Sequence, residues 1–197
     1  TVMGKAHWDD AKNDFTDLWK YTVEDAAVLG QELVISPSID MGIRKDKNLL
    51  LKYMDIFNKS GELCNKFGMR FGYHNHDFEF IKFGSTTGYE ILLNETDKNL
   101  VDFEMDLYWV VRSGNNPLQL FKDHPGRFKM WHVKDMDKVN PAWNAEIGTG
   151  SIDFKSIFAQ AELAGMKRFF LEHETNYKPN PIESAVTSFN YIKKNLI

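Results

Sequence analysis

The chain has 197 residues, 43% hydrophobic and 26% charged, which predicts a globular domain with a sizeable core. A formal net charge of −4 and scattered lysines and arginines offer no basic field to a phosphate backbone, so we expect no nucleic-acid partner. No apolar run approaches the roughly 20 residues of a membrane span, so we expect no membrane association. The single cysteine, Cys64, excludes an internal disulfide, and its helical pattern indicates a buried thiol.

Strand-like and helix-like stretches alternate without a break in composition, which predicts a single domain over residues 1–197. Strands are predicted at residues 2–7, 32–36, 69–75, 100–106, 128–133 and 168–171. Helices are predicted at residues 15–29, 47–67, 89–94 and 154–163, and from Pro117 and Pro181 onward. A long polar loop, residues 134–150, separates two of these units, and loops of that length commonly serve a site.

Four consecutive predicted strands end in two ionisable residues that are two positions apart. The pairs are His74/His76, Glu104/Asp106, His132/Lys134 and Glu172/Glu174. Alternate residues of a strand share a face, so both members of a pair point the same way. The carboxyl ends of parallel strands carry the chemistry of α/β enzymes, so the pairs predict a ring of imidazoles and carboxylates there.

Strands separated by helices predict parallel pairing in either a doubly wound sheet or a (β/α) barrel. Functional residues on four successive strands favour the TIM barrel, where every strand end reaches one central site. Six units are fewer than eight, and 197 residues fall below the roughly 250 of that fold, so we expect its first two β/α units to be absent from this chain. An open edge would need a cover, either the absent segment or a second copy in a homo-oligomer. The sequence starts at Thr1 and not at Met, so a removed leader stays open. The location, cytoplasmic or exported, stays open for the same reason.

Five stretches carry a family resemblance. They are residues 68–80 (GMRFGYHNHDFEF), 103–109 (FEMDLYW), 131–135 (WHVKD), 146–154 (EIGTGSIDF) and 170–174 (FLEHE). In this order and spacing they resemble the sugar phosphate isomerase/epimerase family of xylose-isomerase-like TIM barrels, and the likeness covers essentially the whole chain. The resemblance implies a divalent metal at the barrel mouth and a sugar or polyol substrate bound through neighbouring oxygens.

Carried over to this sequence, the family's metal ligands fall on His74, Asp106, His132 and Glu172. Imidazoles and carboxylates without a thiolate suit Mn²⁺, Co²⁺, Zn²⁺ or Mg²⁺, and the metal's identity stays open. Members of the family commonly have glutamate where His74 stands. The histidine at this position and the pattern Tyr-His-x-His around it resemble the inosose dehydratase branch of the family.

The expected chemistry is removal of a proton from a carbon next to a metal-bound carbonyl. Glu172 or Glu174 is the expected base, and Lys134 would place an ammonium near the developing negative charge. Glu104 and Asp135 are expected to orient histidine ligands. The expected substrate contacts are His76, Trp109, Lys134, Glu146 and His7.

Plainer interpretations stand beside these. His74 and His76 can be ordinary polar residues at a strand end, Lys134 can be solvated, and Glu104 can pair structurally with a cation. Three function classes therefore remain. A metal-dependent sugar isomerase or epimerase is the leading hypothesis, and a keto-polyol or keto-sugar dehydratase is the alternative. The third class is a non-catalytic carbohydrate-binding protein or an endonuclease-like relative that shares the barrel, and the acidic net charge argues against the endonuclease.

Overall fold

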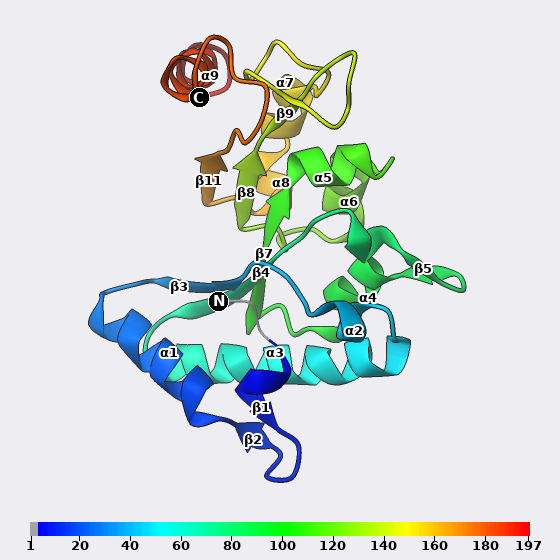
Figure 1. The fold of residues 1–197 in the computed structure, drawn as a ribbon, viewed down its shortest axis with the longest axis vertical. Coiled ribbons are helices and arrows are strands. Elements are labelled where there is room, and N and C mark those ends of the chain that lie inside the picture. Colours follow the sequence, from blue (N-terminus) through cyan, green and yellow to red (C-terminus); the bar gives the residue numbers. More distant parts are fainter. Residues whose placement is uncertain (1–3) are drawn as a thin grey trace. The chain divides into compact units, whose positions relative to one another are not determined.

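The computed structural model describes residues 4–197, and the chain divides into two compact units, Thr1–Phe103 and Glu104–Ile197. Strands and helices alternate in both units, as predicted. The first unit contains η1 (Lys5–His7), β1 (Trp8–Asp9), β2 (Asp14–Phe15), α1 (Asp17–Val28), β3 (Leu33–Ser36), α2 (Met41–Arg44), α3 (Lys47–Lys66), β4 (Arg70–His74), η2 (Phe78–Phe80), β5 (Lys82–Phe83), β6 (Thr86–Thr87) and α4 (Gly88–Glu95) (Figure 1). Strand β7 (Val101–Asp106) crosses the division between the units.

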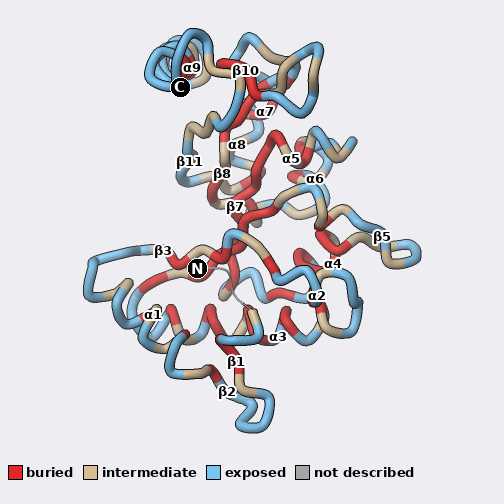
Figure 2. The backbone as a smooth tube through the Cα atoms, viewed as in Figure 1, coloured by how far each residue is buried: buried red, intermediate tan, exposed pale blue. Residues whose placement is uncertain are grey.

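The second unit continues with α5 (Leu107–Arg112), α6 (Pro117–Asp123), β8 (Met130–Val133), β9 (Asp135–Met136), β10 (Asn144–Ala145), α7 (Phe154–Phe158), α8 (Ala161–Ala164), β11 (Arg168–Leu171) and α9 (Pro181–Asn195). Strand β8 pairs in parallel with both β7 and β11. Figure 2 shows β7 and β8 as largely buried. Their carboxyl ends therefore share one edge, where the predicted site residues lie.

The core of the first unit forms where α3 packs on β4, which pairs in parallel with β3. The helix begins after Asp46, whose side chain accepts hydrogen bonds from the backbone of Asn48 and Leu49. One face of α3 is buried, and its Phe57 ring lies 5.3 Å from the ring of Phe71 on β4. Cys64 is on this buried face, and burial raises the pKa of its thiol to about 12, which confirms the expected buried thiol.

Four local expectations differ from the structure. The predicted loop at residues 134–150 contains the short strands β9 and β10, which form an antiparallel pair. The predicted strand at residues 2–7 lies partly outside the described residues, and Lys5–His7 within it is a 3₁₀ helix. The predicted helix at residues 154–163 is two short helices, α7 and α8. Helix α5 was not predicted, because Asp106 was assigned only as a strand end, whereas its side chain also accepts from the backbone N–H of Trp109 and caps that helix.

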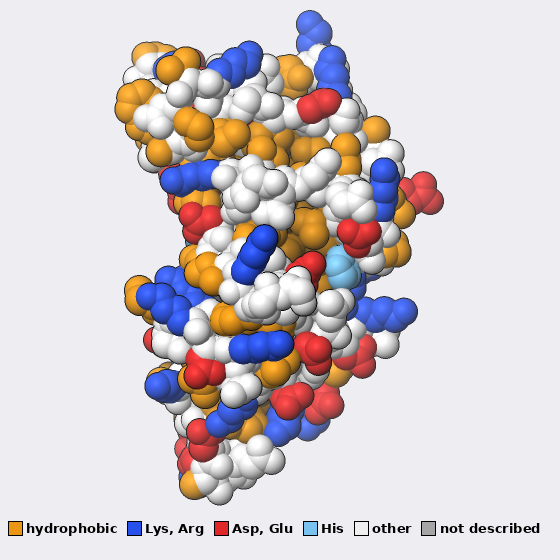
Figure 3. Space-filling view, turned by 90° about the vertical axis from the view of Figure 1, so that its right-hand side faces the viewer, with side chains coloured by type: hydrophobic (Ala, Val, Ile, Leu, Met, Phe, Trp, Pro, Cys, Tyr) orange, Lys and Arg blue, Asp and Glu red, His pale blue; other side chains and the backbone are white. Residues whose placement is uncertain are grey.

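No helix among residues 4–197 is long and apolar enough to cross a lipid bilayer. On the face shown in Figure 3, lysine and arginine side chains alternate with acidic ones. Neither sign forms a continuous field on that face. This pattern is typical of a solvated surface.

Gly61 gives a direct test of the packing of α3. A Cβ at Gly61 would lie 2.4 Å from the backbone oxygen of Leu100, so Gly61→Ala forces the helix and this backbone apart. We expect a loss of about 2 kcal/mol in the free energy of unfolding, although alanine is the better helix former. Urea denaturation measures the loss, with the exposed neighbour Glu62→Ala as the control. A G61A protein as stable as the wild type would contradict this close approach.

Candidate functional site

Three predicted metal ligands meet at the carboxyl edge of the second unit. The β-sheet register pairs Asp106 on β7 directly with His132 on β8, and Glu172 follows β11, which pairs with β8 on its other side. One ligand atom from each of Asp106, His132 and Glu172 lies within 4.8 Å of the other two. Bonds of about 2.0–2.3 Å to one divalent ion span such separations.

Two carboxylates hold the imidazole of His132. Its Nδ1 lies 3.0 Å from Oε2 of Glu172, and its Nε2 lies 3.3 Å from Oε2 of Glu104. Burial lowers the pKa of His132, but the hydrogen bonds and charges of Glu104 and Glu172 outweigh it and raise the pKa to about 10. The expectation that Glu104 orients a histidine agrees with this contact.

Lys134 is buried, with 1% of the residue exposed, so the interpretation of a solvated lysine is wrong. Its ammonium contacts the carboxylates of both Glu172 and Glu174, so the two glutamates reach the same group. Burial lowers the pKa of Lys134, but Asp106, Glu174 and Glu172 together raise it above its ordinary value. The lysine therefore carries its charge at neutral pH.

Glu172 is the shared partner of His132 and Lys134. Burial raises its pKa, but the hydrogen bonds and charges of His132 and Lys134 lower it to about 2. Trp109 completes this side of the site, because the ammonium of Lys134 lies 5.5 Å from the centre of the Trp109 ring. Six predicted residues are thus brought together in one unit, namely Asp106, Trp109, His132, Lys134, Glu172 and Glu174.

The long loop is held by a residue for which we expected another role. The Asp135 carboxylate accepts four backbone hydrogen bonds, from Met136, Gly148, Gly150 and Ile152, at 2.8–3.1 Å. All hydrogen bonds described for the Asp135 side chain come from backbone N–H groups of the long loop and of Ile152 just after it, and none involves a histidine ligand. A Cβ at Gly150 would lie 2.3 Å from Oδ1 of Asp135, so this turn requires glycine.

Glu146, a predicted substrate contact, is buried in the second unit and accepts a hydrogen bond from Ser184 of α9 at 2.7 Å. Burial raises its pKa, but this hydrogen bond and nearby cationic groups leave the pKa below its ordinary value. Glu146 therefore attaches the loop to α9, and its role toward substrate stays a prediction.

His74 and His76 lie in the first unit, where β4 ends. Their rings are edge to face with centroids 4.9 Å apart, so the two imidazoles are neighbours, as predicted for a strand-end pair. Phe78 stacks on His76 at 5.2 Å, and the Arg44 guanidinium lies 3.5 Å from the centre of the Phe78 ring. Their parts in metal and substrate binding stay predictions.

His7, the remaining predicted contact, is buried in the first unit. Its Nδ1 accepts from the backbone N–H of Gly4 at 3.2 Å, and its ring lies edge to face with Trp19 at 5.5 Å. Burial lowers the pKa of His7, so the neutral imidazole is favoured. These contacts are those of a core histidine, and a role in substrate binding stays a prediction.

Two supporting residues escaped sequence reasoning. Oδ1 of Asn144 accepts from the backbone N–H groups of Glu174 and Thr175, at 2.8 and 3.2 Å, and so fixes the segment that carries Glu174. The buried Glu79 carboxylate accepts from the backbone N–H of His76 at 2.8 Å and contacts the Tyr73 hydroxyl. Each residue had one signal in the sequence: Glu79 lies in the motif at residues 68–80, and Asn144 lies in the long loop.

A family model described as xylose isomerase-like TIM barrel matches residues 4–195. The chain belongs to the xylose isomerase-like TIM barrel family. This membership confirms the predicted fold family and the resemblance on which the expected ligand set was based. The expectation that two β/α units are absent is a separate matter and stays a proposal.

Two of the similar proteins carry enzyme names. An inosose dehydratase of Clostridium botulinum is 32% identical over 156 residues, which are 70% of this chain and 51% of that protein. A crystal structure of a sugar phosphate isomerase/epimerase from Parabacteroides distasonis is 28% identical with a TM-score of 0.78, over 90% of this chain and 62% of that one. The structure of an IOLI protein with a binding zinc atom shares the fold at 14% identity, with a TM-score of 0.70 over 98% of this chain and 73% of that one. The chain spans about half the length of the curated relatives it matches.

Glu79 predicts a pH dependence of stability. Burial is the main cause that raises its pKa from 4.5 to about 7, so between these values the unfolded carboxyl is ionised while the folded one keeps its proton. Stability from this group is thus fully present below pH 4.5 and is lost as the pH rises through about 7. From pH 4 to 8 we expect the wild type to lose roughly 3 kcal/mol relative to Glu79→Gln, measured by urea denaturation.

The glutamine keeps the shape of the side chain and an oxygen for the N–H of His76, so E79Q changes only the titration. Equal pH profiles for the wild type and E79Q would contradict the prediction. The exposed Glu183→Gln serves as a control that should leave the profile unchanged.

Proposed function

We propose that this protein is a metal-dependent isomerase or epimerase that acts on a sugar or sugar phosphate by removing a proton next to a carbonyl. The observation that carries the proposal is the cluster of Asp106, His132 and Glu172, with ligand atoms within 4.8 Å of one another. The name of the Parabacteroides distasonis relative supports the reaction class.

The donor set fits a divalent cation. One imidazole and two carboxylates, with no thiolate, suit Mn²⁺, Co²⁺, Zn²⁺ or Mg²⁺, and the zinc bound by the IOLI protein is among these. His132 would release a proton on binding, because without a metal its pKa of about 10 keeps the imidazole protonated at neutral pH. His74 is the proposed fourth ligand. When bound, such an ion polarises a substrate carbonyl and stabilises negative charge on its oxygen.

The residues of this chain supply the proton chemistry. Glu174 is the proposed base, because its side chain is 56% exposed and leaves Glu172 for the metal. Lys134, held charged between these glutamates, is placed to stabilise negative charge that develops on a substrate oxygen. Trp109 offers a ring face beside Lys134 for the apolar side of a sugar.

The alternative is a dehydratase that acts on a keto-polyol or keto-sugar at the same site. The specific observation in its favour is that the curated relatives, among them the Clostridium botulinum protein, are named inosose dehydratase. Both reactions begin with loss of the proton next to a carbonyl, and they part when a hydroxide leaves. Mass spectrometry of the products separates them, since dehydration lowers the mass by about 18 Da and isomerisation leaves it unchanged.

We further propose that additional β/α units complete the barrel beyond this chain. Among the described residues β11 pairs only with β8, so its other edge is open. Apolar side chains are also exposed on β11 and α9, namely Phe170, Ile182, Val186 and Phe189. The match covers 62% of the Parabacteroides distasonis chain, which supports a larger fold. A second copy of the chain is the other candidate for this surface.

The ligand set is tested by replacing its members one at a time. We expect Asp106→Ala and His132→Ala each to abolish metal retention in elemental analysis and to lower activity by about 10³-fold or more. Glu174→Gln should retain the metal and lower kcat by about 10²- to 10⁴-fold. The exposed Glu183→Gln is the control for a lost carboxylate. Unchanged metal content and activity in D106A and H132A would refute the site.

The apolar surface of α9 is tested by adding charge to it. Phe189 is 56% exposed, so Phe189→Lys should change the free energy of unfolding by less than about 0.5 kcal/mol. If Phe189 lies in an interface between copies, F189K should lower the mass of the particle in light scattering. Thr187→Lys adds the same charge at another exposed position of α9 and should leave the mass unchanged. A large loss of stability in F189K alone would contradict the exposure of this side chain.

A further inference from the structure

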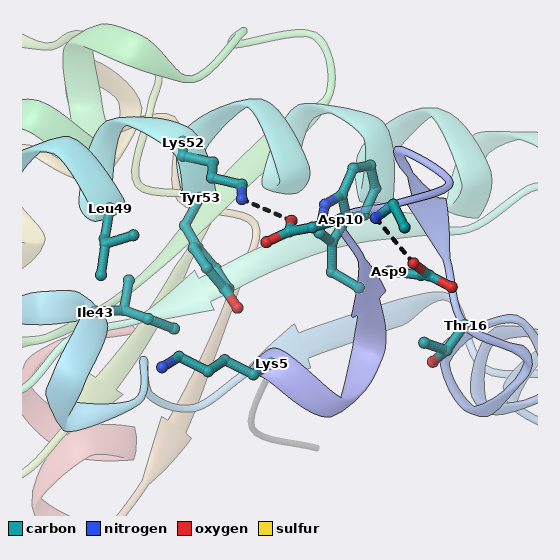
Figure 4. A pocket seen from close by; sticks show the side chains of 10 residues that line it. Lys5, Asp9, Asp10, Thr16, Ile43, Leu49, Lys52 and Tyr53 are labelled. Atoms are coloured by element: carbon teal, nitrogen blue, oxygen red, sulfur yellow. Dashed lines mark hydrogen bonds and ion pairs between the residues drawn. The ribbon is translucent and has the colours of Figure 1, made fainter.

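A cavity of about 570 Å³ opens in the first unit, and none of its lining residues belongs to the predicted site (Figure 4). Its walls come from η1, the β1–β2 hairpin and helices α2 and α3. The volume falls within the range of about 300–1,000 Å³ that small-molecule sites occupy. The cavity is therefore large enough for a ligand of monosaccharide size.

Tyr53 of α3 is the distinctive residue of this cavity. Only 5% of the residue is exposed, and its hydroxyl points into the cavity (Figure 4). That hydroxyl has no hydrogen-bond partner within residues 4–197. The hydroxyl oxygen is open to the cavity, so it is placed to donate to, or accept from, a polar group of a ligand that enters.

Ionic groups around the cavity balance one another. The ammonium of Lys52 lies 2.6 Å from Oδ1 of Asp10, and Lys5 and Asp9 add one charge of each sign. Asp9 is already engaged, since it accepts from the backbone of Ala11 at 3.0 Å and pairs with Lys12. A lining with equal numbers of ammonium and carboxylate groups does not favour a strongly charged ligand of either sign.

The remaining walls are apolar or aromatic. Trp8, Ile43 and Leu49 line the cavity together with the ring of Tyr53. Such walls pack against the C–H faces of a ring, while its hydroxyl groups can both donate to carboxylates and accept from ammonium and phenol groups. A neutral ring that carries several hydroxyls satisfies both parts of the lining.

We propose that this cavity is a second carbohydrate site, which binds a neutral polyol of monosaccharide size independently of the metal cluster. Tyr53 donates a hydrogen bond to the polyol, and the Lys52–Asp10 pair contacts its hydroxyls. The cavity has no part in the metal-dependent reaction proposed above, so either proposal can be refuted without the other.

Titration with myo-inositol and D-glucose, followed by NMR at the Tyr53 and Trp8 signals, tests the proposal on the whole chain. We expect saturable shifts with a Kd of about millimolar, and weaker or no binding of inorganic phosphate. Tyr53→Phe removes only the hydroxyl and should weaken polyol binding about five- to tenfold. The exposed Tyr21→Phe is the matched control and should leave binding unchanged.

Thermal unfolding of Y53F tests whether weaker polyol binding comes from a loss of stability. Because the Tyr53 hydroxyl has no partner among the described residues, Y53F should unfold at the wild-type temperature or above it. Retained polyol binding in His132→Ala separates this cavity from the metal cluster. The proposal is overturned if neither polyol gives a saturable shift, because the Tyr53 hydroxyl would then contact only water. It is also overturned if Y53F binds the polyols as tightly as the wild type, or if phosphate binds more tightly than the polyols.

Discussion

The buried ammonium of Lys134 is the constraint on which the candidate site depends. Only 1% of Lys134 is exposed, and an unpaired ammonium at such a position would strongly destabilise the fold. The ammonium therefore needs carboxylates beside it. Glu172 and Glu174 supply them from the segment after β11, and Glu172 at the same time contacts His132 of β8. Satisfying one buried lysine thus gathers the side chains that the proposed chemistry needs at a single edge.

The loops at this edge are fixed by polar side chains that accept from the backbone. Asp135 collects four N–H groups of the long loop, and Asn144 collects those of Glu174 and Thr175. Irregular segments lack the repeating hydrogen bonds of helices and strands, so buried N–H groups need such partners. A rigid edge follows, and a rigid edge is what positions a metal ligand or a base to within a fraction of an ångström.

Sequence reasoning found much of this because its rules are local. Helix α3 could be predicted from an apolar face between Lys47 and Phe67, and the cap at Asp46 acts within three residues. The strand-end pairs could be predicted because side chains alternate along every strand. Asp135 was assigned the wrong partner, since its four hydrogen bonds reach as far as Ile152 through a loop without periodicity. Helix α5 and the break between α7 and α8 were missed because segments of four to six residues carry too little periodicity.

The sequence by itself determined the alternation of strands and helices, the family, and the set of residues at the strand ends, because these follow from side-chain periodicity and from short motifs. Only the tertiary structure decided that Lys134 is buried, that His132 lies between Glu104 and Glu172, and that the Tyr53 hydroxyl faces a cavity. The physical reason is that charge pairing and burial depend on distances between residues far apart in the chain, which no local pattern records.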